Sequence, residues 1–201
     1  MSIRGLAKIY FRDVIETVST LTGIDTDEMF VSGGSINKVC RNDKLGDSDI
    51  DIFFKTKKCS KLIMNNLNVI SKHLNSHGNI YFRIKDINDD YQKINLVTMK
   101  HGKPVDVVNT FDLKCCMGWY DYETDEMNVY PDNDIINLNR NLSMINNPIA
   151  TLQRVIKYIE RGYKIYDNGY QIGKLLELIS KKYKGDLSID EFNNSWKHGG
   201  S

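Results

Sequence analysis

Residues 49–53, with the sequence DIDIF, constrain the fold of this chain more than any other stretch. Successive side chains of a β-strand point to opposite faces, so a strand here buries Ile50 and Ile52 and sets Asp49 beside Asp51 on the other face. Two adjacent carboxylates repel each other unless a cation lies between them. The segment therefore predicts a strand with one face in a core and the other face suited to a metal ion.

A glycine turn precedes this segment. Residues 29–31 are typical of a short buried strand that leads into Ser32, Gly33, Gly34 and Ser35, and thirteen residues (36–48) separate this turn from Asp49. Glycine lets backbone N–H groups approach a phosphate closely, and Ser35 adds a hydroxyl at the start of the next helix, where the helix dipole favours anions. We therefore predict that Gly33, Gly34 and Ser35 bind a triphosphate opposite the carboxylate pair.

A third acidic residue is expected on a neighbouring strand. Asp106 is the isolated acid in the β-branched run 105–108, which we predict to be a strand over 105–109. Carboxylate oxygens suit Mg²⁺, with Mn²⁺ as a substitute, and such a site holds two ions when it activates an attacking hydroxyl. We predict Asp49, Asp51 and Asp106 as metal ligands and catalytic residues, with Asp106 activating the hydroxyl as a metal ligand or as its general base.

The spacing of apolar residues predicts a mixed α/β order followed by helices alone. We expect a head over 1–145, a helical neck over 146–196 and a disordered tail over 197–201. The expected helices cover 6–21, 36–41, 63–78, 148–161 and 170–183, with a short one after Ser188, and the expected strands cover 29–31, 49–54, 79–85, 93–99 and 105–109.

Composition excludes several classes of protein. The 201 residues contain 27 Lys plus Arg against 26 Asp plus Glu, so the chain is not a wholly basic nucleic-acid coat. Apolar residues make up 41% and charged residues 26%, which excludes wholesale disorder. No apolar run is long enough to cross a membrane, so we expect no membrane partner. Four cysteines without metal-type spacing favour reduced thiols and a cytoplasmic location.

The combination of the glycine turn, the spaced DxD pair and a later isolated acid resembles the nucleotidyltransferase superfamily that includes DNA polymerase β. Residues 105–112 (VDVVNTFD), 146–148 (NNP) and 161–163 (RGY) further resemble the head and neck of bacterial poly(A) polymerases and CCA-adding enzymes. The resemblance implies an α+β fold with a mixed-sheet head and a helical neck. It also implies Mg²⁺-dependent transfer of a nucleoside monophosphate from an NTP to a hydroxyl, with an RNA 3′ end, such as that of tRNA, as the favoured acceptor.

Departures from that group limit what carries over. Thr110 and Phe111 stand where the group has two arginines before the Asp that corresponds to Asp112, and Ala150 stands where the neck has an arginine. The choice of base therefore does not transfer. The body and tail that hold tRNA in longer relatives are also absent from these residues.

Two groups of cations could neutralise phosphate charge or could be ordinary solvated side chains. Lys38, Arg41 and Lys44 follow the glycine turn. Arg154, Lys157 and Arg161 recur on the polar side of the neck helix, where they would contact nucleotide or RNA phosphates. We count Lys38, Arg41 and Arg154 among the predicted nucleotide-binding residues.

Two alternatives to an RNA acceptor remain open. Compact relatives of the toxin and antibiotic-modifying kind transfer a nucleotide to a protein or a small molecule, and the missing RNA-binding body is compatible with that reaction. A catalytically silent nucleotide-binding or RNA-binding regulator is the third possibility, against which the intact pair of Asp49 and Asp51 argues.

Overall fold

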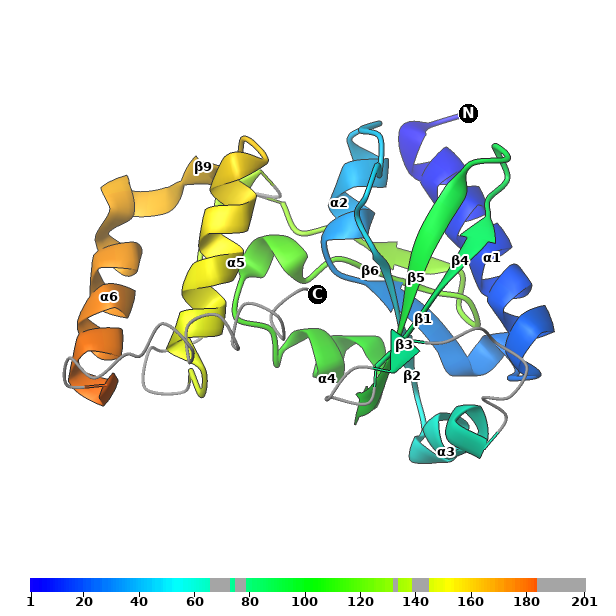
Figure 1. Cartoon of the computed structure of the whole chain (residues 1–201). Helices are drawn as coiled ribbons and strands as arrows, with labels where there is room; N and C mark the ends of the chain where they lie inside the picture. Colours follow the sequence, from blue (N-terminus) through cyan, green and yellow to red (C-terminus); the bar gives the residue numbers. More distant parts are fainter. Residues whose placement is uncertain (66–72, 75–78, 132–133, 139–144, 184–201) are drawn as a thin grey trace. The chain divides into compact units, whose positions relative to one another are not determined.

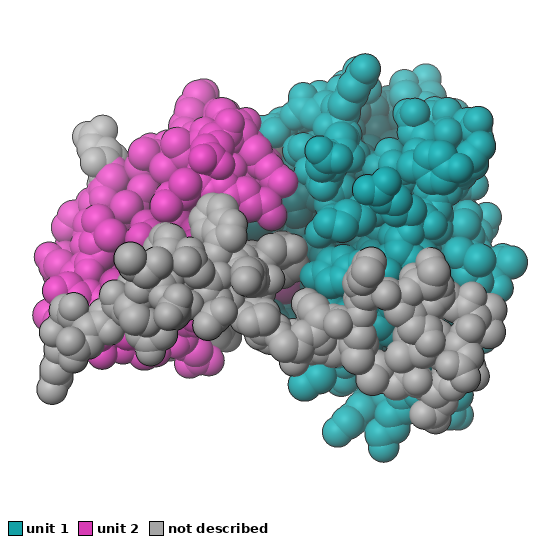
Figure 2. All heavy atoms as spheres, in the orientation of Figure 1, with its two compact units in different colours: residues 1–110, 116–130 teal, residues 111–115, 131–201 magenta. Residues whose placement is uncertain are grey.

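The structure is a computed structural model that describes residues 1–65, 73–74, 79–131, 134–138 and 145–183 (Figure 1). Its contacts divide the chain into two compact units, coloured separately in Figure 2. Unit 1 comprises 1–110 and 116–130, and unit 2 comprises 111–115 and 131–201. The segments 111–115 and 131–138 thus belong with the helical unit, whereas we assigned them to the head. The functional division at residue 145 stays a prediction.

Helix α1 (Ile3–Thr22) opens unit 1 where its sequence period predicts a helix. The hydroxyl of Ser2 accepts a hydrogen bond from the Gly5 N–H at 3.1 Å and caps the N-terminus. Gly23 ends the helix with a φ of 71°, a left-handed conformation that glycine adopts without strain. The helix lies along one side of the sheet in Figure 1 and buries Phe11 and Val14.

A seven-stranded mixed sheet forms the body of unit 1, in the order β3-β4-β5-β2-β1-β6-β7. β2 pairs with β5 in parallel, and the other neighbours are antiparallel. The strands are β1 (Met29–Ser32), β2 (Ile50–Phe54), β3 (His73–Leu74), β4 (Ile80–Lys85), β5 (Tyr91–His101), β6 (Trp119–Asp121) and β7 (Glu126–Asn128). The remaining helical elements of this unit are η1 (Thr26–Glu28), α2 (Gly34–Cys40), α3 (Lys57–Asn65) and α4 (Pro104–Val108). The short turn η3 (Lys114–Cys116) has its first two residues in unit 2 and its last in unit 1.

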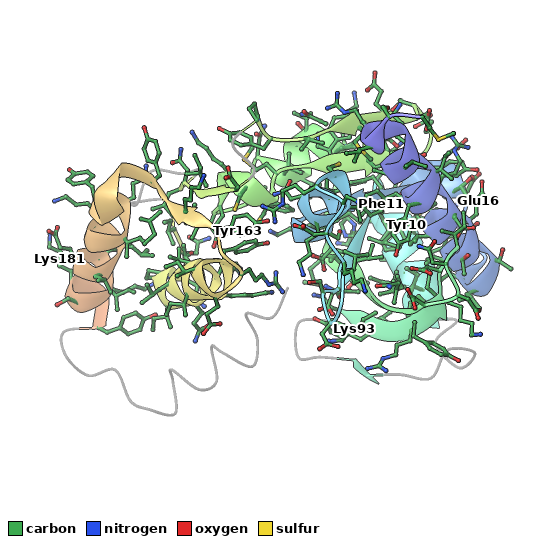
Figure 3. All side chains as sticks on the ribbon, turned by 90° about the horizontal axis from the view of Figure 1, so that it is seen from above. Tyr10, Phe11, Glu16, Lys93, Tyr163 and Lys181 are labelled. Carbon is green, nitrogen blue, oxygen red and sulfur yellow. The ribbon has the colours of Figure 1, made fainter. Side chains whose placement is uncertain are left out.

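The two faces of the sheet differ in chemistry. Toward α1, the inward residues of the central strands, such as Ile52 and Leu96, form a core with Phe11. On the other face Phe30 of β1 stacks on Phe53 of β2, with ring centroids 5.4 Å apart. Asp51 shares that second face, because it is two residues from Phe53 on the same strand. Phe11 on α1 and Lys93 on β5 help to locate the elements in Figure 3.

Unit 2 is built mainly from two helices. α5 (Pro148–Glu160) packs against α6 (Tyr170–Tyr183), and a short parallel pair joins β8 (Ile135–Ile136) to β9 (Lys164–Ile165), followed by η5 (Tyr166–Gly169). Tyr158 and Tyr163 meet edge to face with centroids 4.8 Å apart. Asn147 caps α5 by accepting from the Ala150 N–H, and Pro148 occupies its first turn. The predicted helices from 148 and over 170–183 are confirmed.

Two predicted elements are wrong. The segment 105–109 is not a strand, because Pro104 begins the short helix α4 instead, after extended Lys103. The helix expected over 63–78 ends in its described part at Asn65, and His73 and Leu74 pair with Tyr81 and Ile80 as β3. These two residues find backbone hydrogen-bond partners at the edge of β4. The spacing of apolar residues along the chain does not reveal such a partner.

The α+β fold class is confirmed, with a mixed sheet in one unit and helices in the other. No helix in the described ranges is long and apolar enough to span a membrane. The short helix expected after Ser188 and the tail over 197–201 lie outside the described residues.

Candidate active site

Asp49 and Asp51 lie where β2 begins, and strand β5 supplies a partner to each of them. Asp51 pairs in register with Asn95, and the Asn95 amide Nδ2 donates to Asp51 Oδ1 at 2.6 Å. Asp49 and Lys93 each stand two residues before this pair, and the Lys93 ammonium lies 3.1 Å from Asp49 Oδ1. That contact is an ion pair without hydrogen-bond geometry, because Asp49 Oδ1 has no hydrogen-bond partner in the described part of the chain. The parallel pairing of β2 and β5 therefore brings a partner from β5 to each carboxylate.

The glycine turn touches the same carboxylate. Gly33 has a φ of 101°, and a Cβ built on it would lie 2.9 Å from Asp51 Oδ2. Side-chain carbons essentially never approach an atom that closely, so a larger residue here would force the Asp51 carboxylate to shift, and the φ itself favours glycine. The turn and the DxD segment, which the sequence suggested as one site, are brought together.

The residues beside Gly33 hold the turn in place. The Ser32 hydroxyl donates to the Gly118 carbonyl at 2.7 Å, and the Gly33 N–H donates to the same oxygen at 3.3 Å. Gly34 begins α2, and Ser35 is 2% exposed. The Ser35 hydroxyl has no hydrogen-bond partner among the described residues, so it is a buried polar group that a ligand could satisfy.

The predicted phosphate-binding cations after the turn are occupied within unit 1. Lys38 Nζ donates to Ser48 Oγ at 2.8 Å and to the Leu45 carbonyl at 3.3 Å, which fixes the loop that precedes Asp49. Arg41 forms an ion pair with Asp43 at 2.9 Å. Lys38 thus positions the DxD segment, while Arg41 belongs to a surface pair.

Asp106 is not on a strand beside β2. It is an exposed residue of α4, a helix that packs against β1 and β6 and buries Val107 and Val108. In the described residues, no group of three or more His, Cys, Asp or Glu is arranged to hold a metal ion. The expected triad with Asp49 and Asp51 is therefore not assembled, and Asn95 occupies the strand position that faces Asp51.

Arg154 lies in unit 2, where its guanidinium is engaged by Asp112. The Arg154 guanidinium contacts Asp112 Oδ2, and Thr151 donates to the same oxygen at 2.7 Å. The Asp112 side chain is 17% exposed and that of Arg154 is 27% exposed. The pair ties the segment 111–115 to α5, which gives Arg154 a structural role within this unit.

The donor set is compatible with a divalent cation. Two carboxylates suit Mg²⁺ or Mn²⁺, and Asp49 Oδ1 together with the Asn95 amide oxygen is buried without a hydrogen-bond donor in the described part of the protein. Asp49 and Asp51 would hold such an ion. The set supports two carboxylate ligands rather than the three that we predicted.

Lys93 and Asn95 were not identified from the sequence. The alternation of polar and apolar residues over 93–96 (KINL) predicts that both side chains share one face of a strand. It does not predict that this strand pairs in parallel with β2, which is what brings them to Asp49 and Asp51.

Solved structures with a similar fold include CCA-adding and tRNA-processing enzymes. A CCA-adding enzyme in complex with ATP has a TM-score of 0.60 at 12% identity, covering 95% of this chain and 46% of that chain. A tRNA-processing enzyme with CTP has a TM-score of 0.58 at 12% identity, covering 91% and 50%. The Thermotoga maritima CCA-adding enzyme complexed with tRNA has a TM-score of 0.56 at 13% identity, covering 95% and 45%. This chain spans about half the length of these structures, and the likeness confirms a nucleotidyltransferase-type fold.

The family whose model matches this chain is not the bacterial group that the motifs resemble. No curated protein matches the chain. A family model described as "Gad2: Gabija anti-defense 2 family protein" matches residues 6–142, which include the glycine turn, the DxD segment and most of the described sheet. The chain belongs to the Gabija anti-defense 2 family.

Proposed function

We propose that this protein is a metal-dependent nucleotidyltransferase that transfers a nucleoside monophosphate from an NTP to a hydroxyl group and releases pyrophosphate. The observation that carries the proposal is the contact of the glycine turn with the DxD segment. A Cβ at position 33 would displace the Asp51 carboxylate oxygen, so phosphate and metal sites would share one small region. The nucleotidyltransferase-type fold supports the same activity.

Each residue of the site has a task in this reaction. Asp49 and Asp51 would hold Mg²⁺, which when bound neutralises phosphate charge. Asn95 keeps the Asp51 carboxylate oriented, and Lys38 holds the loop before Asp49. Gly34 and Ser35 would donate to phosphate oxygens from the backbone and the hydroxyl. Asp106 stays a candidate for the base that accepts the proton of the attacking hydroxyl. In that role the Asp106 side chain would have to reach the acceptor from its position on α4.

An RNA 3′ end is one acceptor that we propose, because similar folds include an enzyme complexed with tRNA. Lys157 on α5 and Arg161 at its C-cap would then contact the RNA backbone. Arg154 is left out of this set because Asp112 already holds its charge.

A protein acceptor is the second candidate, and a specific observation favours it. The predicted RNA contact Arg154 is engaged by Asp112, so its charge is already paired within unit 2. The family description names an action against a defence called Gabija. A protein component of that defence would be the nucleotidylated acceptor.

One experiment separates the acceptors. Purified protein is incubated with each α-³²P-labelled NTP and Mg²⁺, together with either total tRNA or purified Gabija proteins. Asp49→Asn serves as the inactive control. Label on lengthened RNA supports the RNA acceptor, whereas label on a polypeptide supports the protein acceptor. Absence of label and of released pyrophosphate with every NTP and both acceptors would contradict the proposed transferase activity.

A further inference from the structure

Strand β5 presents a cation and an amide to the carboxylate pair, where the resemblance implied a third acid. Lys93 and Asn95 are two residues apart, so their side chains lie on the same face of the strand. Ile50 pairs with Ile94 and Asp51 with Asn95, which sets Asp49 at the level of Lys93. The two carboxylates therefore face one positive charge and one hydrogen-bond donor.

The two carboxylates differ in how they are held. The Asn95 side chain is buried, and its amide donates to Asp51 in a short hydrogen bond of 2.6 Å. The Lys93 side chain is 44% exposed, and its ammonium meets Asp49 Oδ1 at 3.1 Å without hydrogen-bond geometry. The half-exposed ammonium can turn to solvent, and because the Asp49 side chain is only 13% exposed, its charge then needs another cation, such as a divalent ion, in that place. Asp49 is thus the carboxylate whose partner can leave.

The surroundings of Lys93 are positively charged. Arg83 of β4 lies directly opposite Lys93 in the antiparallel register, and Arg83 is exposed. Like charges placed directly across two strands destabilise a sheet, so this arrangement needs an anion to offset it. Asp49 offsets one of the two charges in the metal-free protein.

We propose that Lys93 is the resident cation of the DxD site: it neutralises Asp49 in the metal-free protein, competes with the divalent ion for that carboxylate, and binds the triphosphate once the ion displaces it. The inference rests on the proposed function, because it assigns a further binding residue to the same site. It gives Lys93 two effects of opposite sign. Its charge opposes the metal ion and attracts the phosphates.

The opposite effects on metal-ion affinity and phosphate affinity distinguish this role from a structural one. Replacement by Lys93→Met removes one positive charge from near the ion, which in water-like surroundings at about 5 Å corresponds to roughly tenfold tighter binding of Mn²⁺. The same change removes one charge-assisted contact with phosphate and weakens binding of inorganic tripolyphosphate by about three- to tenfold. Loss of structure alone would weaken both.

Lys85 supplies a matched control. Like Lys93, it forms an ion pair with an aspartate, Asp89 at 2.8 Å, and its ammonium lies 5.6 Å from the centroid of a tyrosine ring, that of Tyr91. The corresponding distance from Lys93 to the Tyr81 ring is also 5.6 Å. Lys85→Met therefore removes contacts of the same two kinds without touching the DxD segment, and it should leave both affinities unchanged.

The test measures Mn²⁺ binding by electron paramagnetic resonance and tripolyphosphate binding by calorimetry at saturating Mg²⁺, for the wild type, Lys93→Met, Lys93→Gln and Lys85→Met. Tighter Mn²⁺ binding with weaker tripolyphosphate binding in either Lys93 variant supports the inference. Unchanged Mn²⁺ affinity, or a loss of both affinities, overturns it while the metal site stands. Absence of Mn²⁺ binding by every protein overturns the metal site of the proposed function, and the role of Lys93 with it.

Discussion

Gly33 and Asp51, eighteen residues apart in the sequence, approach so closely that a Cβ on Gly33 would lie 2.9 Å from the Asp51 carboxylate oxygen Oδ2. The φ of 101° at Gly33 independently disfavours any other residue. Two separate constraints therefore act on one position. Because both are local to the turn and the DxD segment, they can be tested apart from the rest of the fold.

Gly33→Ala should remove activity and Mn²⁺ binding, because the new methyl group displaces the Asp51 carboxylate. It should also destabilise unit 1 by roughly 1–3 kcal/mol through backbone strain. Gly46→Ala is the matched control, since Gly46 also has a positive φ, 54°, but nothing lies within 4 Å of its Cβ position. Thermal melts and Mn²⁺ titrations of both variants check this. Equal Mn²⁺ binding by Gly33→Ala and the wild type would contradict the contact.

Asp49→Asn and Asp51→Asn should each abolish transfer and Mg²⁺ dependence without unfolding the protein. Removing one of two neighbouring carboxylate charges relieves repulsion, which for Asp49→Asn offsets the lost ion pair with Lys93, so the melting temperature of the metal-free variants should stay nearly equal. Asp47→Asn is the control, because Asp47 is an exposed acid in the preceding loop. Pyrophosphate release and melting curves are measured together. Near wild-type turnover in either of the two variants would show that the carboxylates are not the metal ligands.

Asn95→Asp should make the stability of unit 1 depend on divalent ions. The new carboxylate would be buried against Asp51, where it loses the 2.6 Å hydrogen bond and repels a like charge. We expect a lower melting temperature in EDTA and recovery in Mg²⁺ that exceeds the Mg²⁺ effect on the wild type. Asn95→Leu, which also loses the hydrogen bond but adds no charge, should not recover. The prediction fails if Mg²⁺ raises both variants equally.

Asp106→Asn should retain NTP binding and lose most of the transfer rate, if Asp106 accepts the proton of the acceptor. An amide of the same size cannot accept that proton. Nucleotide titration and single-turnover rates separate the two effects. Full activity of the variant would remove Asp106 from the catalytic residues, in keeping with its exposed position on α4.

Breaking the pair of Asp112 and Arg154 should destabilise unit 2. Arg154→Met leaves a largely buried carboxylate that still accepts from the Thr151 hydroxyl, and we expect a cost of roughly 2 kcal/mol, between the values for exposed and buried pairs. Adding Asp112→Asn should restore part of this loss, which a double-mutant cycle measures. The exposed pair of Lys174 and Glu177 in α6 is the reference, with an expected coupling near zero. Additive losses at Asp112 and Arg154 would show that the pair is not coupled.

The sequence by itself determined the elements whose signals are local. Gly23 ends α1, Pro148 begins α5, and the alternation around Asp51 predicts β2 with its carboxylate on the face away from the core. Caps, glycine turns and apolar periods act over a few residues, so they can be recognised without knowledge of the neighbours.

Only the tertiary structure decided what those elements meet. The parallel pairing of β2 with β5 brings Asn95 and Lys93 to the carboxylates, whereas the run around Asp106 becomes α4 because Pro104 begins a helix there. β3 likewise exists because its two residues pair with β4. Strand pairing joins residues that are far apart in the sequence, and its register depends on hydrogen bonds and buried surface contributed by both strands. One strand's own sequence therefore cannot specify its partner.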